Sequence, residues 1–251
     1  MPSSALARSR KQRRGVELLC EGVFRPLAHP LVLALARLRV PPPAVVLAAG
    51  AAGFGGAVEL GRGSFIAAAL LVQLKTLLDN ADGQLARLTG KTSAFGRYLD
   101  SEIDLLVNAA LFAALGWRFS QPALALVGFV ALTSVLSLNF NAERLSRAAI
   151  AEPDEDMASN TVLLSLVRRV YRIVYAPQDR LAEWVVARRP SLTSSSSVTV
   201  LANLGMSSQL ALFGLFLVLG HPLGFAWLAI GELIVIALAV LPQRLPREET
   251  A

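Results

Sequence analysis

The chain has 251 residues, of which 54% are hydrophobic and only 17% are charged, and its formal net charge at pH 7 is +6. Soluble domains carry about 25% charged residues, so this composition favours a protein whose solvent is lipid. The single cysteine, Cys20, excludes an internal disulfide and a cysteine-based zinc cluster. Because His29 and His221 are far apart, any metal ion here is expected to be a hard cation bound by oxygen ligands.

Residues 1–40 are predicted to form a basic N-terminal region that includes an amphipathic helix. Five basic residues lie among the first fourteen: Arg8, Arg10, Lys11, Arg13 and Arg14. The apolar stretch that follows is interrupted by Glu17 and Glu21, which is not the pattern of a signal-peptide core. A helix that lies on an anionic membrane surface accounts better for both features.

Six apolar segments follow, each close to the roughly 20 residues that a helix needs to cross a bilayer. They are Pro43–Leu60, Phe65–Leu85, Tyr98–Trp117, Ala123–Phe140, Val198–Leu219 and Leu223–Leu241. We therefore expect an all-α integral membrane domain of six transmembrane helices over residues 41–242, with a polar C-terminal tail over residues 243–251. The Ala/Gly run from Ala48 to Gly56 would let the first span pack closely against its neighbours.

The basic residues predict how these spans are oriented. Only Arg62 and Arg118 fall in loops on one side, whereas nearly all the others fall on the opposite side. The positive-inside rule then places both termini in the cytoplasm of a multi-pass plasma or inner-membrane protein. A nucleic-acid-binding face would not be divided so cleanly by hydrophobic spans, so no nucleic-acid partner is expected.

A long cytoplasmic loop is predicted over residues 148–197, between the fourth and fifth spans. It begins with an acidic stretch, continues with a predicted amphipathic helix from Thr161 to Tyr175, and ends in the serine run Ser194 to Ser197. Two interpretations remain open for it, a surface helix with a linker and a lid over an active site.

Four aspartates lie at the predicted cytoplasmic ends of the second and third spans: Asp79, Asp82, Asp100 and Asp104. Carboxylates at this depth are costly unless they are paired, bound to metal or facing water. Helical spacing places the first two on one helix face and the last two on one face of the next helix, and a short turn lets the faces meet. Interfacial carboxylates can also cap helices or pair with basic groups, but four in this register favour a metal site.

Two divalent cations would relieve the repulsion among four converging carboxylates, and Mg²⁺ or Mn²⁺ accepts such ligands. Two such ions can hold the attacking and leaving oxygens of a phosphoryl displacement. Gly83 and Gly96 remove side chains where a bulky ligand could approach, and Arg87 offers a planar donor pair for phosphate oxygens. Lys75, four residues before Asp79, could either pair with that aspartate or contact substrate.

The pattern D-x2-D-G-x2-A-R-x8-G-x3-D-x3-D resembles the signature of the CDP-alcohol phosphatidyltransferase family. Its fixed positions are all present: Asp79, Asp82, Gly83, Ala86, Arg87, Gly96, Asp100 and Asp104. The resemblance implies transfer of a substituted phosphate from a CDP-linked donor to an alcohol, with release of CMP. It also implies three helices on each side of a polar, cytoplasm-facing cavity, and an association into homodimers.

The resemblance further implies roles for individual residues. Asp79 and Asp100 would bridge both metal ions, Asp82 would bind one, and Asp104 would bind the other and take the proton from the attacking hydroxyl. The positions where the family contacts the CDP moiety, directly or by close approach, are Gly83, Ala86, Arg87, Ser93 and Gly96. By contrast, the start of the first span lacks the Asn and hydroxyl residue that many relatives use to hold the nucleotide.

A polar cluster at the end of the fourth span suggests a pocket for a polar or phosphorylated alcohol. Asn139 and Arg144, with Lys75, are the candidate residues, and Arg144 is the candidate phosphate contact. The donor could be CDP-diacylglycerol or another CDP-alcohol. Two other classes of protein remain as alternatives: a membrane prenyltransferase with Asp-rich helices, and a metal transporter or inactive relative without enzymatic activity.

Overall fold

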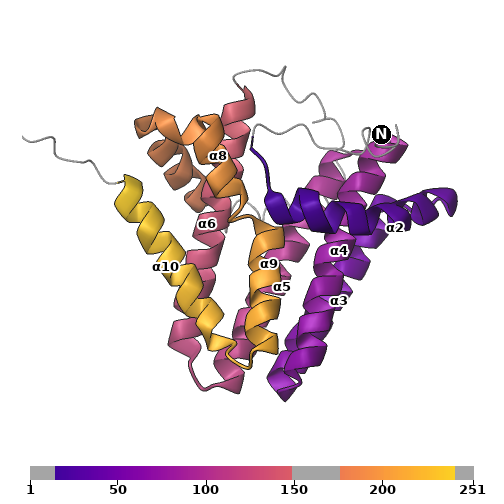
Figure 1. The fold of residues 1–251 in the computed structure, drawn as a ribbon, viewed down its shortest axis with the longest axis horizontal. Helices are drawn as coiled ribbons and strands as arrows, with labels where there is room; N and C mark the ends of the chain where they lie inside the picture. The colour runs from indigo at the N-terminus through magenta and orange to yellow at the C-terminus, as the bar shows by residue number, and fades with distance from the viewer. Residues whose placement is uncertain (1–14, 149–175, 241–251) are drawn as a thin grey trace, which may run out of the picture.

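The computed structural model describes residues 15–148 and 176–240, and within these ranges the secondary structure is helical (Figure 1). The elements with defined bounds are η1 (Cys20–Phe24), α2 (Arg25–Arg37), α3 (Pro42–Arg62), α4 (Phe65–Thr89), α5 (Ala94–Arg118), α6 (Pro122–Ala148), η2 (Pro190–Thr193), α8 (Ser195–Ala202), α9 (Met206–Val218) and α10 (Leu223–Val240). Residues 176–188 form a further helix between α6 and η2.

Four stretches are long and apolar enough to cross a membrane: Pro42–Arg62, Pro122–Ser146, Ser195–Val218 and Leu223–Val240. They correspond to four of the six predicted spans, and the chain is a multi-pass membrane protein. The other two predicted spans lie in α4 and α5, which have 25 residues each and carry the charged residues of the predicted metal site.

Glycines on α3 bring both α4 and α5 close to it. A Cβ added at Gly50 would lie 2.8 Å from Ile103, and one at Gly53 would lie 2.5 Å from Val107, both on α5. A Cβ at Gly56 would lie 3.1 Å from Val72 on α4. The close packing predicted for this small-residue run is confirmed, and α4 and α5 pack mainly against α3 rather than against each other.

The connection between α4 and α5 is short because each end carries a terminating residue. Gly90 ends α4 with a φ of 66°, a left-handed conformation that glycine adopts without strain. Ser93 begins α5, where its side chain accepts a hydrogen bond from the Gly96 N–H. The acidic residues on the last turns of α4 and the first turns of α5 are therefore held at the same end of the molecule.

The fifth predicted span, Val198–Leu219, is broken into α8 and α9 at residues 203–205. At the break, the Asn203 side chain accepts a hydrogen bond from the Leu18 N–H at 2.9 Å and donates to the Val16 carbonyl at 2.8 Å. The N-terminal segment thus docks at the break, where one side chain bonds to two of its backbone groups. The serine run ahead of α8 supplies its cap, with the Ser194 hydroxyl accepting from the Ser197 N–H.

The predicted N-terminal amphipathic helix corresponds to η1 and α2, while residues 1–14 lie outside the described ranges. In α2, Ala28 and Val32 are buried against Ala81 and Leu85 of α4, whereas Leu27 is exposed. Part of the predicted 148–197 loop, including Thr161–Tyr175 and the acidic stretch, also lies outside the described residues.

Candidate metal centre

Three of the four predicted ligands meet where α4 and α5 face each other. Asp79, Asp82 and Asp100 each offer one carboxylate oxygen, and these oxygens all lie within 4.8 Å of one another. Two of these residues come from α4 and one from α5, so the two acidic faces identified from helical spacing do converge.

The fourth aspartate, Asp104, is linked to this group through Lys75. The Lys75 ammonium donates a hydrogen bond to Asp79 Oδ1 at 2.9 Å and a second one to Asp104 Oδ1. The lysine side chain is only 1% exposed, and a buried ammonium is stable only when it has such partners. Of the two interpretations left open for Lys75, the structure shows the ion pair with Asp79 and adds Asp104 as a second partner.

The carboxylates fit a divalent cation. Asp82 is 7% exposed, and within the described residues its Oδ2 atom is buried without a hydrogen-bond partner. A buried, unpartnered carboxylate oxygen is costly, and a cation at this position would relieve that cost. Oxygen donors are the ligands that Mg²⁺ and Mn²⁺ prefer. Asp79, Asp82 and Asp100 are the residues that would hold the ion.

Arg87 and Gly83 lie one turn apart on α4 and are packed on each other. A Cβ at Gly83 would lie 3.3 Å from Nη1 and 3.4 Å from Nη2 of Arg87. The guanidinium group of Arg87 therefore lies over the backbone of Gly83, the residue that follows Asp82. A side chain at Gly83 would crowd this group. Ala86 lies partly buried on the same helix, and its carbonyl accepts a hydrogen bond from the Lys91 N–H at 2.9 Å.

Ser93 and Gly96, both predicted near the CDP moiety, form the N-terminal cap of α5. The Gly96 N–H donates to Ser93 Oγ at 3.0 Å, and a Cβ at Gly96 would lie 3.2 Å from that oxygen. Sequence reasoning assigned both residues to ligand binding and missed this structural role. The signal for it was the serine at the start of a predicted helix, because serine is a preferred N-cap residue and its side chain accepts a hydrogen bond from the N–H three positions later.

Of the three residues predicted for the acceptor pocket, Asn139 and Arg144 lie on α6 and contact other elements, whereas Lys75 lies on α4 among the aspartates. Arg144 donates to Asn141 Oδ1 at 3.1 Å and forms an ion pair with Glu183 of helix 176–188. Asn139 lies beside the break between α8 and α9, since a Cβ at Gly205 would be 3.2 Å from its Nδ2 atom. These partners of Arg144 come from α6 and helix 176–188, not from the acidic cluster, the name used below for Asp79, Asp82, Asp100 and Asp104.

Asn80 joins the acidic cluster to two further elements and was not singled out from the sequence. Its Nδ2 atom donates to Ser207 Oγ of α9 at 3.2 Å, and its Oδ1 atom accepts from Cys20 Sγ at 3.0 Å. Asn80 occupies a variable position of the D-x2-D pattern, so the motif carried no signal for it. Through this residue the start of α9 and η1 are fixed beside Asp79.

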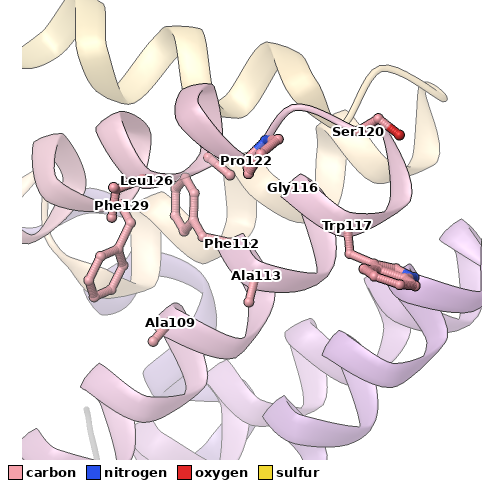
Figure 2. A pocket seen from close by; sticks show the side chains of 10 residues that line it. Ala109, Phe112, Ala113, Gly116, Trp117, Ser120, Pro122, Leu126 and Phe129 are labelled. Atoms are coloured by element: carbon pink, nitrogen blue, oxygen red, sulfur yellow. The ribbon is translucent and has the colours of Figure 1, made fainter.

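A cavity of about 830 Å³ lies elsewhere, between α5 and the start of α6 (Figure 2). Its lining is mostly apolar and comprises Ala109, Phe112, Ala113, Gly116, Trp117, Ser120, Pro122, Ala125, Leu126 and Phe129. At 1.5 Å per residue, the lining runs along α5 from Ala109, roughly 7.5 Å from Asp104, to beyond Gly116, roughly 18 Å from it. None of the four aspartates lines this cavity, and its lining offers few groups that could bind phosphate or metal.

Comparisons with known proteins agree with the motif. The chain is 32% identical over 124 residues to a phosphatidylinositol phosphate synthase of Mycolicibacterium smegmatis, covering 47% of this chain and 56% of that protein. It is 43% identical over 67 residues to an archaetidylinositol phosphate synthase of Pyrococcus horikoshii, covering 25% and 36% respectively. The matched segments thus span less than two thirds of these curated relatives.

Among solved structures, a Mycobacterium tuberculosis phosphatidylinositol phosphate synthase with CDP-DAG bound matches 82% of this chain and 94% of its own, with 21% identity and a TM-score of 0.40. The family model described as CDP-alcohol phosphatidyltransferase matches residues 27–241, which include α3 to α10 and every aspartate of the acidic cluster. The chain belongs to the CDP-alcohol phosphatidyltransferase family.

Proposed function

We propose that this protein transfers a substituted phosphate group from a CDP-linked donor to the hydroxyl of an alcohol and releases CMP. The observation that carries the proposal is the convergence of Asp79, Asp82 and Asp100, with Asp104 tied to the same site through Lys75. This arrangement lies in a chain whose family is defined by that chemistry.

The acidic cluster supplies the ligands for two divalent cations, Mg²⁺ or Mn²⁺. When bound, such ions neutralise the charge of the diphosphate and stabilise the charge that develops on transfer. Asp79 and Asp100, which come from different helices, would be shared by the two ions, while Asp82 on α4 would hold one of them and Asp104 on α5 the other.

Asp104 is the proposed general base. In the transfer, the acceptor oxygen forms a bond to the phosphorus of the donated group, the bond from that phosphorus to the CMP oxygen breaks, and the hydroxyl proton passes to Asp104. The hydrogen bond from Lys75 to one carboxylate oxygen of Asp104 would orient this carboxylate for the proton transfer.

Arg87 is proposed to bind the phosphates of the donor. Its guanidinium lies over Gly83, on the α4 face that carries Asp79 and Asp82, and two parallel N–H groups suit phosphate oxygens. Ala86, Ser93 and Gly96 are proposed to shape the CDP site by allowing close approach of the nucleotide.

An inositol phosphate is the first acceptor to test, with CDP-diacylglycerol as the first donor. Both curated relatives described above are named as synthases of an inositol phosphate attached to a lipid group. Arg144 and Asn139 remain the proposed acceptor residues, and contact with an acceptor phosphate would require Arg144 to exchange its ion pair with Glu183 for that ligand.

The proposed membrane arrangement has six transmembrane helices over residues 41–242, with α4 and α5 adding to the four apolar spans. The acidic cluster, both termini, and a tail over residues 243–251 would then face the cytoplasm, and α2 would lie along the membrane surface within the 1–40 region. A cytoplasm-facing polar cavity would open at the acidic cluster, and two chains would associate as a homodimer. The 148–197 loop would lie on that same side.

A donor–acceptor screen on the purified protein tests this function. With Mn²⁺ present, CMP should appear only when a CDP-linked donor and its matching alcohol are both supplied. Asp100→Asn should abolish this release. Glu59→Gln is a matched control, because Glu59 is an acidic residue near the C-terminal end of α3, where it pairs with Arg62. Consumption of prenyl diphosphates, or transport of metal into vesicles without CMP release, would refute the proposal.

A further inference from the structure

Lys75 is a fixed positive charge inside the acidic cluster. Its side chain is 1% exposed, and its ammonium is shared between Asp79 on α4 and Asp104 on α5. Since α4 and α5 pack mainly against α3, this shared ammonium is a direct side-chain link between the two helices that carry the carboxylates.

We propose that Lys75 is a positioning residue that makes the two cation positions of this site unequal, an inference that rests on the proposed function. The first ion would be held by Asp79, Asp82 and Asp100, whose oxygens already lie within 4.8 Å of one another. The first ion would share only Asp79, one of these three ligands, with the Lys75 ammonium, whereas an ion at Asp104 must compete with that ammonium for the one carboxylate that the first site does not use.

The charges of the cluster support this order of binding. Four ionised carboxylates and one ammonium carry three net negative charges, so one divalent ion leaves one negative charge and a second ion leaves one positive charge. A second ion therefore becomes favourable chiefly when the negatively charged diphosphate of the donor is bound beside it. Lysine suits this role because its ammonium has three donors and no fixed fork, so it can hold two carboxylates from different helices.

Binding of Mn²⁺ without nucleotide tests the proposal directly, by electron paramagnetic resonance of the purified protein in detergent. The parent protein should bind one Mn²⁺ tightly and a second about tenfold or more weakly. Lys75→Met, which removes the charge and keeps an apolar chain of similar length, should strengthen the second site until the two affinities are nearly equal. Lys91→Met is the matched control, because Lys91 is an exposed lysine after α4, and it should behave like the parent.

Thermal unfolding gives a second measurement that does not require a titration. In EDTA, Lys75→Met should unfold at a lower temperature than Lys91→Met, since the carboxylates then repel each other without a fixed cation. Added Mn²⁺ should raise the unfolding temperature of Lys75→Met more than that of the parent. The double variant Lys75→Met with Asp104→Asn should be more stable in EDTA than Lys75→Met alone, because it removes one of the repelling charges.

Two results would overturn the inference: two equal Mn²⁺ sites in the parent, or a Lys75→Met variant that keeps the parent's unequal sites and its stability in EDTA. If Lys75→Met does not fold, Lys75→Arg provides the test. This variant keeps the positive charge, so its two Mn²⁺ affinities should remain unequal. Two equal Mn²⁺ sites in Lys75→Arg would contradict the proposal. These measurements use Mn²⁺ alone, so a failure of CMP release with every donor would reject the proposed function without changing their outcome.

Discussion

Gly83→Ala should raise the stability of the fold and weaken use of the CDP-linked donor at the same time. The added Cβ would lie 3.3 Å and 3.4 Å from the two terminal nitrogens of Arg87, so the guanidinium must move by a few tenths of an ångström. Because it is the far end of a flexible side chain, that movement costs the fold little. Replacing glycine by alanine inside a helix stabilises by about 1 kcal/mol.

The expected loss lies in donor binding, because a displaced guanidinium no longer meets the phosphate oxygens in the same geometry. A hydrogen bond to a charged group contributes about 1.5–3 kcal/mol, which corresponds to a loss of roughly 10- to 100-fold in kcat/KM. Initial rates of CMP release with varied donor concentration measure this loss. Thermal unfolding measures the gain, about 2–4 °C per kcal/mol for a chain of this size.

Gly61→Ala is the matched control, since Gly61 is inside α3 and an added Cβ would meet no atom within 4 Å. It should gain similar stability and keep the parent's kcat/KM. The reasoning would be refuted if Gly83→Ala gained stability as Gly61→Ala does and its kcat/KM stayed within about twofold of the parent.

Two further outcomes are expected. Asp100→Ala should abolish CMP release in an end-point assay, whereas Ser93→Ala should retain most of it. Ser93→Ala should also lower the unfolding temperature, because loss of an N-cap costs about 1 kcal/mol. Equal activities of the two variants would contradict the metal assignment. Gly53→Ala should destabilise the fold by about 1–3 kcal/mol, because its Cβ would lie 2.5 Å from Val107; an unfolding temperature equal to that of Gly61→Ala would show that α3 and α5 separate without cost.

The acidic cluster was predictable because its information is local. Asp79 and Asp82 share a helix face by spacing alone, and so do Asp100 and Asp104. Gly90 ends the first of these two helices, so the turn that joins them is short. The pairing of Lys75 with both Asp79 and Asp104 was not predictable in full. Helical spacing indicates the partner four residues away, but the partner on α5 depends on how two helices are placed against a third.

The helix break at residues 203–205 and the partner of Arg144 were also beyond the sequence pattern. Hydropathy shows one continuous apolar segment there, whereas in the structure Asn203 at the break bonds to residues 16 and 18. Glu183 pairs with Arg144 across 39 residues of chain, and nothing in the local sequence of either residue indicates the other. In both cases the missing information is a contact between distant segments.

The glycines of α3 have a consequence for the chemistry of the site. Because Gly50 and Gly53 set how near α5 lies, and Gly56 does the same for α4, they determine how far apart the carboxylates of the two helices are held. A helix that supplies none of the four aspartates thus sets the spacing of the two helices that carry them. Larger side chains at these glycines would therefore be expected to move the aspartates of α4 and α5 apart without changing any of them.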